Sequence, residues 1–193
     1  NTVHERLNSN ESLTSYQKII SKVRKSIVSI GESEDNLINN IYSNKSSTGI
    51  VIDKYNKIIT SYSNIKNLKD IYVKLPTENN IIVKADLIIG DEDLDIAIIQ
   101  VSIDHELEPV TFASNENLLA GDTSILISNS TGDEYIDSII PGVITSINRR
   151  ITMGKYENIN LLELNININE FNKSGGIFNI NGELIGIANK KIT

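Results

Sequence analysis

The sequence contains no cysteine and no tryptophan, and among its 193 residues only two are histidine and three are proline. The absence of cysteine excludes disulfides, thiolate metal sites and a cysteine nucleophile. His4 and His105 are too few to build a metal site from several histidines. The sequence also has no apolar run of about eighteen residues, so it predicts no membrane-spanning helix.

Positive charge is scarce as well. The chain has 18 Lys and Arg residues against 25 Asp and Glu, which gives a net charge of −7. Because nucleic-acid phosphates are bound by clustered Lys and Arg, we expect no nucleic-acid partner. The acidic groups at 92–95 and 133–137 lack the regular oxygen spacing and central glycine of a calcium loop, so we interpret them as solvated faces. We therefore expect neither a metal ion nor a soluble cofactor.

Most of the chain consists of short strand patterns separated by turn residues, which predicts an all-β fold. Residues 1–13 are polar and without clear periodicity, and we expect a flexible leader there. Apolar residues at helical spacing then predict a short helix that ends near Lys25. We assign this helix and a first β-barrel to residues 14–101, a linker to 102–109 and a second barrel to 110–193.

One stretch near the end of the chain has the character of a catalytic turn. Ser174 precedes Gly175 and Gly176, and a short apolar strand, an Asn181-Gly182 turn and a second apolar strand follow. The two glycines permit a sharp turn beside the serine, and Asn-Gly is a strong signal for a hairpin. An all-β hydrolase presents its nucleophile on such a turn, although an ordinary loop and hairpin fit these residues equally well.

Five sequence motifs succeed one another along the chain, at 47–53, 58–65, 91–101, 119–122 together with 142–146, and 174–176. Each motif is weak alone, but their order resembles the trypsin-like serine protease fold in its bacterial HtrA (DegP-like) branch. The resemblance extends over roughly residues 17–190. It implies two antiparallel six-stranded β-barrels with a site between them.

The resemblance also implies a set of site residues. It places the nucleophile at Ser174 and the triad aspartate at Asp95, but Ser63 occupies the position of the histidine base. It places the oxyanion hole on the backbone N–H groups of Asn172 and Ser174, with Asn172 where glycine is usual. A serine does not accept a proton at neutral pH as imidazole does, so we expect a pseudoprotease. Without a histidine, Asp95 becomes a candidate acceptor for the Ser63 hydroxyl.

No other base stands out in the sequence. His105 falls in the expected linker, and we interpret it as a solvated loop residue. Lys173 is adjacent to Ser174, and neighbouring side chains in a turn rarely face each other. His4 lies in the expected leader. An atypical serine endopeptidase that uses Ser174 with a non-standard base therefore remains an alternative hypothesis.

The first hypothesis for function is an inactive domain that holds an extended peptide or a protein partner by strand addition. A weak hydrolase and a purely structural spacer are the other two. The resemblance implies an extracytoplasmic location. Because the chain begins at Asn1, without methionine, we expect a piece of a longer protein, with a membrane tether outside this sequence.

Overall fold

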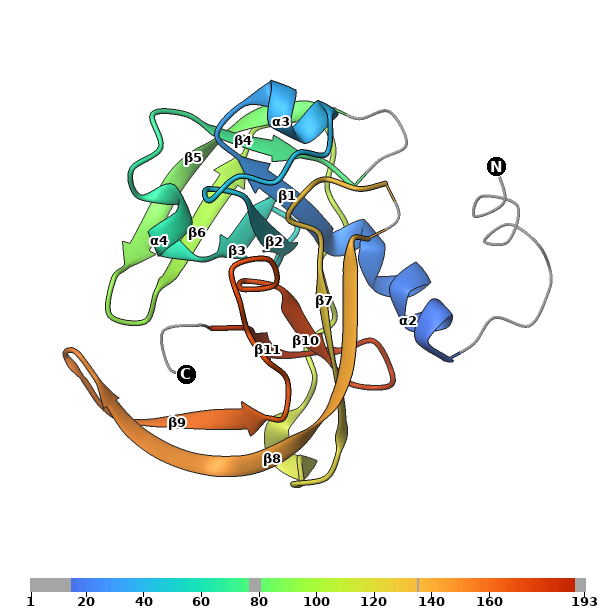
Figure 1. Cartoon of the computed structure of the whole chain (residues 1–193), viewed down its shortest axis with the longest axis vertical. Helices are drawn as coiled ribbons and strands as arrows, with labels where there is room; N and C mark the ends of the chain where they lie inside the picture. The colour runs from blue at the N-terminus through green and yellow to red at the C-terminus, as the bar shows by residue number, and fades with distance from the viewer. Residues whose placement is uncertain (1–14, 77–80, 135, 190–193) are drawn as a thin grey trace.

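The computed structural model describes residues 15–76, 81–134 and 136–189, so the expected leader lies outside the described residues. These residues form a closed six-stranded β-barrel, in the order β1-β2-β3-β6-β5-β4, and a five-stranded open sheet, in the order β11-β10-β7-β8-β9 (Figure 1). The predicted all-β fold with two barrel-like halves is confirmed. The prediction of six strands in each half is correct for the first barrel only, since the described part of the second half has five strands and does not close.

The first barrel is built from antiparallel strands whose alternate side chains point inward. Its strands are β1 (Ile27–Gly31), β2 (Ser47–Val51), β3 (Lys57–Thr60), β4 (Ile71–Lys74), β5 (Ile82–Asp91) and β6 (Ile96–Val101). On β6 the buried side chains are Ala97, Ile99 and Val101, in strict alternation. Gly49 on β2 faces the same interior, where a Cβ atom would lie 2.6 Å from the Ile58 side chain. Only glycine leaves room for the barrel to close there.

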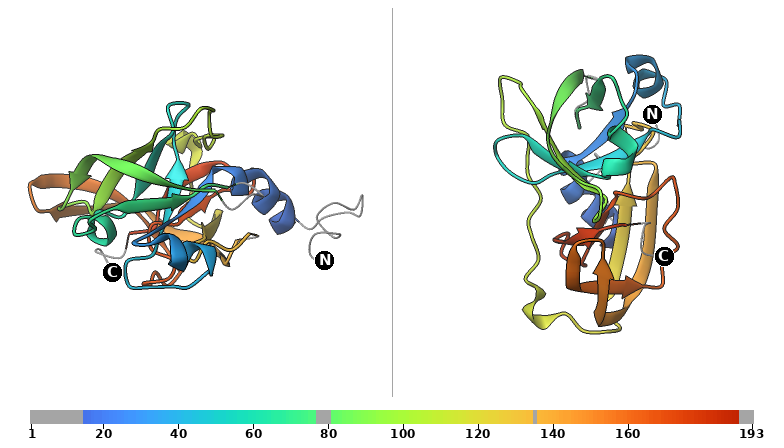
Figure 2. Two further views of the ribbon diagram at one scale, coloured as in Figure 1. Left: turned by 90° about the horizontal axis from the view of Figure 1, so that it is seen from above. Right: turned by 90° about the vertical axis from the view of Figure 1, so that its left-hand side faces the viewer.

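The second half is an open, curved sheet. Its strands are β7 (Thr123–Ser128), β8 (Ser138–Met153), β9 (Tyr156–Leu164), β10 (Gly176–Phe178) and β11 (Leu184–Ile187). The predicted hairpin at Asn181-Gly182 is confirmed, because β10 pairs with β11 and Gly182 takes the left-handed φ of +70°. Figure 2 shows the connecting segment, in yellow-green, running along one side of the molecule from the barrel to this sheet.

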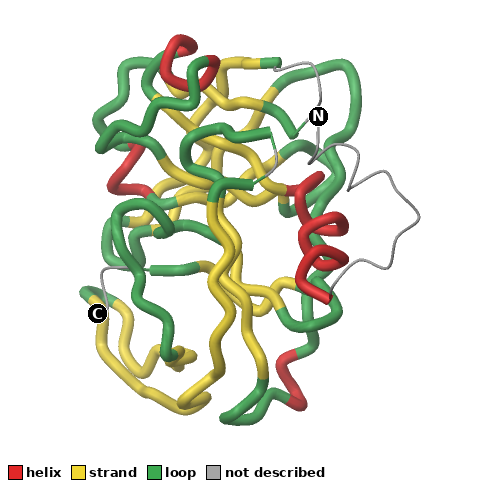
Figure 3. Tube along the Cα trace, turned by 45° about the vertical axis from the view of Figure 1, so that its right-hand side comes forward, coloured by secondary structure: helices red, strands yellow, loops and turns green. Residues whose placement is uncertain are grey.

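The predicted N-terminal helix forms as α2 (Ser15–Val23) and continues as the 3-10 turn η1 (Arg24–Ser26). Its buried residues Ile19 and Val23 belong to an apolar cluster that also contains side chains of β1, β2, β7 and β10. We name this the shared cluster; its buried members are Ile19, Val23, Ile27, Ile50, Val110, Ile125, Ile127, Phe178 and Leu184. The helix therefore lies against the strands where the two halves meet, as Figure 3 shows. None of the helices in the described ranges has the length and apolar character needed to cross a membrane.

Three further short helical turns connect the strands: α3 (Glu34–Ile38), α4 (Tyr62–Ile65) and η2 (Asn115–Asn117). The first of these turns, α3, lies between β1 and β2. The Ser33 hydroxyl caps this helix by accepting a hydrogen bond from the Asn36 N–H at 3.2 Å.

A buried lysine links the first barrel to the loop that follows β7. The Lys74 ammonium donates to the backbone oxygens of Leu37, at 2.9 Å, and Gly132, at 2.7 Å, and to Asn40 Oδ1 at 3.3 Å. Its burial lowers the pKa of Lys74 below the ordinary value, although the Asp133 and Glu134 carboxylates oppose the shift. Burial thus disfavours the charged form of Lys74, and the three hydrogen bonds fix the position of its ammonium group.

The contribution of Lys74 to stability is expected to depend on pH. Replacing Lys74 by methionine removes three hydrogen bonds and should lower the free energy of unfolding by roughly 1–3 kcal/mol at pH 7. Because the folded-state pKa is depressed, the wild type gains stability relative to the variant as pH rises from the folded pKa towards 10.5. Urea unfolding at pH 7 and pH 10 measures both effects. Lys84→Met, on the neighbouring strand β5, is the exposed control; an equal pH response in the two variants would contradict the assignment to Lys74.

Candidate functional site

Asp95 and Ser63 meet at the edge of the first barrel. Asp95 immediately precedes β6 and has a left-handed φ of 53°. Its Oδ1 accepts from the Ser63 backbone N–H at 2.6 Å, and its Oδ2 accepts from the hydroxyls of Ser63 at 3.1 Å and Ser61 at 2.8 Å. Three donors from the start of α4 thus surround the carboxylate. In this structure Asp95 holds that turn in place.

The Ser174 hydroxyl points to the backbone of the first barrel. Ser174 is 1% exposed and has a left-handed φ of 63°. Its Oγ donates to the backbone oxygen of Thr48 at 2.7 Å and accepts from the Thr48 N–H at 3.2 Å. A nucleophilic serine instead donates to a base that removes its proton. The hydrogen bonds of Ser174 therefore suit a structural role, in which they link the turn before β10 to strand β2.

The backbone donors expected for an oxyanion hole are also engaged within the chain. The Ser174 N–H donates to the Ala188 oxygen at 2.9 Å, and the Asn172 N–H donates to Asn169 Oδ1 at 3.2 Å. The Asn172 side chain holds the turn further, since its Oδ1 accepts from the Asn169 N–H at 2.8 Å and its Nδ2 donates to the Asn167 oxygen at 3.0 Å. Oxyanion stabilisation needs donors aimed at the developing charge. In this structure the N–H groups of Asn172 and Ser174 both donate to acceptors within the chain.

Ser174 and Asp95 nevertheless line one small cavity of about 20 Å³. Ser61 lines it as well, whereas Ser63, which occupies the histidine position, does not. A cavity of this size has room for a single water molecule and none for an imidazole ring. The sequence motifs did not single out Ser61. Its small polar side chain directly before α4, a position typical of a helix cap, is the signal that was available.

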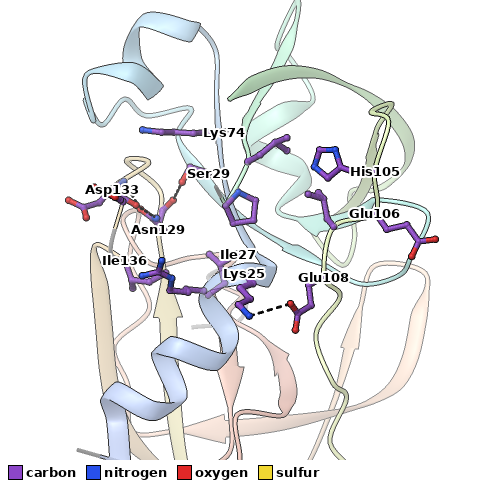
Figure 4. Close-up of a pocket in the computed structure, with 15 residues that line it drawn as sticks. Lys25, Ile27, Ser29, Lys74, His105, Glu106, Glu108, Asn129, Asp133 and Ile136 are labelled. Carbon is purple, nitrogen blue, oxygen red and sulfur yellow. Dashed lines mark hydrogen bonds and ion pairs between the residues drawn. The ribbon is translucent and has the colours of Figure 1, made fainter. Parts of the chain in front are cut away.

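The other two candidate bases in the described residues, His105 and Lys173, each pair with a carboxylate, although Lys173 also lines the cavity of Ser174 and Asp95. The His105 Nδ1 atom pairs with Asp104 Oδ1 at 2.9 Å, and the ring lines a separate cavity of about 360 Å³ (Figure 4). That cavity lies among β1, β4, the linker and the loop after β7, and neither Ser174 nor Asp95 lines it. The Lys173 ammonium pairs with Glu170 Oε2 at 2.9 Å. His4 lies outside the described residues.

A larger groove of about 560 Å³ lies between β9 and β11, the two end strands of the open sheet. Aliphatic side chains dominate its lining: Ile151, Leu161, Leu162, Leu164, Ile166, Ile168, Ile177, Ile185 and Ile187. End strands present backbone N–H and C=O groups that a further strand can pair with. In the part of the chain that the structure describes, no three His, Asp or Glu side chains gather in a way that could hold a metal ion.

Comparison with known proteins places this geometry in a family. Residues 47–187 match the family described as Trypsin-like peptidase domain. The chain belongs to the trypsin-like peptidase family. Among its relatives, the Serine protease Do-like HtrA of Lactococcus lactis subsp. lactis is 31% identical over 115 residues, which cover 58% of this chain and 28% of that protein. A Probable periplasmic serine endoprotease DegP-like of Halomonas elongata is 28% identical over 146 residues, covering 76% and 29%.

The structural comparison agrees with the sequence comparison. The crystal structure of Deg5 superposes with a TM-score of 0.72 at 22% identity, covering 91% of this chain and 85% of that one. The trypsin-like, HtrA-type fold predicted from the motif order is thus confirmed. The trypsin-like domain spans less than a third of the length of the two curated relatives.

Proposed function

We propose that this trypsin-like domain is a catalytically inactive module that binds an extended peptide or a protein partner. The observation that carries the proposal is the state of the Ser174 hydroxyl, which is buried and bound to the backbone of Thr48. Serine stands at position 63, where the family's base belongs, and the Asp95 carboxylate accepts from Ser61 and Ser63. Acyl transfer needs a base for the serine proton and donors for the oxyanion, and the donation of the Ser174 hydroxyl and of the Asn172 and Ser174 N–H groups to acceptors within the chain supports an inactive state.

The groove between β9 and β11 supports the binding half of the proposal. An extended peptide that enters there meets strand edges for backbone hydrogen bonds and aliphatic pockets for alternate side chains. The only ion pair in the lining, Arg149 with Glu163 at 2.9 Å, leaves no net charge among the described residues of the groove. We therefore infer a preference for uncharged, β-branched side chains.

We also propose an extracytoplasmic location, with a membrane tether outside this sequence. The Halomonas elongata relative is named as periplasmic, which supports the location. The proposed location is inferred from this relative and is independent of the binding proposal.

Two measurements on the purified domain test the proposed function together. A fluorophosphonate probe should leave Ser174 unlabelled under conditions that label an active trypsin-like protease. A fluorescent decapeptide of alternating valine and threonine should bind in an anisotropy titration, whereas the same peptide with N-methylated amides should not, because it cannot pair with a strand edge. Leu164→Arg in the groove should weaken binding at least tenfold, and Ile180→Arg, whose parent side chain is 65% exposed in the turn between β10 and β11 and does not line the groove, should not.

The outcomes separate the hypotheses. Labelling that Ser174→Ala abolishes would overturn the inactive assignment and favour an atypical endopeptidase. No labelling together with no peptide binding would favour a structural spacer.

A further inference from the structure

The tip of the β8–β9 hairpin crosses from the second half of the molecule to the first. There it meets the turn 91–95, which joins β5 to β6 (Figure 1). The Lys155 N–H donates to Asp93 Oδ2 at 3.2 Å, and the Tyr156 hydroxyl donates to Asp91 Oδ2. The hydrogen bond from Tyr156 also holds the pKa of the Asp91 carboxyl below its ordinary value. The hairpin is therefore bonded at its far end to the turn that carries Asp95.

Gly154 makes this close approach possible. Its φ is +55°, and a Cβ atom at this position would lie 2.1 Å from the carboxyl carbon of Asp93 and 2.2 Å from Oδ1. Any other residue would require the Asp93 carboxylate to move away and would also strain the backbone. The tip is thus shaped to fit against Asp93.

The rest of the β8–β9 hairpin has irregular strand pairing. The pairing of β8 with β9 shifts register at three places, between Ile144 and Ser146, between Ser146 and Arg149, and between Ile151 and Met153. Such irregularities bend and twist a two-stranded ribbon. Residues of the same ribbon, including Ile151 and Leu162, form one wall of the groove between β9 and β11. The ribbon that carries the tip therefore also lines the groove.

We propose that the hairpin tip is a latch that restrains the β8–β9 wall of the peptide groove when Asp91 and Asp93 hold it. The inference rests on the proposed function, because it concerns access to the same groove. A peptide strand that enters beside β9 has to displace the ribbon, and the closed latch resists this displacement. By thermodynamic reciprocity, releasing the latch strengthens peptide binding, and bound peptide loosens the latch by the same factor.

A glycine pair tests the latch with a matched control. Gly154→Ala should open it because the new Cβ displaces the Asp93 carboxylate, whereas Gly121→Ala also places alanine at a positive φ, of +95°, with no atom within 4 Å of the new Cβ. Without peptide, hydrogen exchange at the Lys155 amide should be at least tenfold faster in Gly154→Ala than in Gly121→Ala. With the valine–threonine decapeptide, Gly154→Ala should bind at least threefold more tightly. Unchanged exchange at Lys155 would overturn the latch.

A disulfide provides the opposite test. The chain has no native cysteine, so Asp93→Cys with Lys155→Cys creates one defined pair. The oxidised form should bind the decapeptide at least tenfold more weakly than the form reduced with dithiothreitol, and equal affinities would refute the gating. If no form binds peptide while Gly154→Ala still frees the tip, the proposed function and the gating both fail. Faster exchange with unchanged affinity would refute the gating alone.

Discussion

Ser63→His alone is expected to leave the domain as inactive toward casein and peptide esters as the unmodified protein. An imidazole at position 63 would lie beside Asp95, but the Ser174 hydroxyl is bound to Thr48 and the shared cavity is only about 20 Å³. Loss of the base typically reduces turnover by roughly 10⁴–10⁶, and loss of one oxyanion donor by about 10²–10³. Restoring the base therefore leaves a large part of the barrier in place.

The second substitution that matters is at Asn172. Its side chain holds the turn through Asn169 and Asn167, and glycine in its place would release both contacts and permit a left-handed backbone. We expect Ser63→His with Asn172→Gly to gain measurable esterase activity, because the turn can then present its N–H groups. Hydrolysis of a chromogenic peptide ester measures it. Turnover by the unmodified domain that is abolished by Ser174→Ala would refute the inactive assignment.

Ser174→Ala is expected to destabilise the fold, whereas replacing a serine with a purely catalytic role would leave stability unchanged. The hydroxyl joins two segments 126 residues apart, and its removal leaves the buried Thr48 N–H without this acceptor. The free energy of unfolding should fall by about 1–3 kcal/mol, which for a chain of this size corresponds to a melting temperature lower by several degrees. Thermal and urea unfolding both report it.

Ser128 provides the matched control for this stability effect. It is a fully buried serine on β7 whose Oγ has no hydrogen-bond partner among the described residues. Removing an unpaired hydroxyl costs little, so Ser128→Ala should leave the melting temperature nearly unchanged. Equal destabilisation by the two substitutions would show that the Ser174 hydrogen bonds contribute nothing specific.

Much of the fold could be read from local patterns, because turn chemistry and alternation act over a few residues. The Asn181-Gly182 hairpin and the strand over 95–101 are examples. Strand β8, which contains the motif at 142–146, was harder to delimit, because it runs from Ser138 to Met153. Its extension includes Pro141, which lacks an N–H and is usually read as the end of a strand.

Less of the candidate site could be predicted from the sequence. Pattern and resemblance named Ser63 and Asp95, which do meet. They gave no sign of where the Ser174 hydroxyl or the Ser174 N–H would bond, because those partners, Thr48 and Ala188, act through backbone atoms. Backbone acceptors have no residue-specific signature, so only the three-dimensional arrangement shows that the nucleophile position is occupied by structural hydrogen bonds.

The shared cluster makes the two halves dependent on each other for folding. Ile27 and Ile50 come from the first barrel, Ile125 and Phe178 from the second sheet, and Ile19 from the helix, yet all are buried in one apolar body. Each half has a core of its own, but removing either half would expose the side chains that the other half contributes to the shared cluster. The linker after β6 therefore divides the strands into two sheets, but we expect the two sheets to unfold together, because loosening either half exposes the shared cluster.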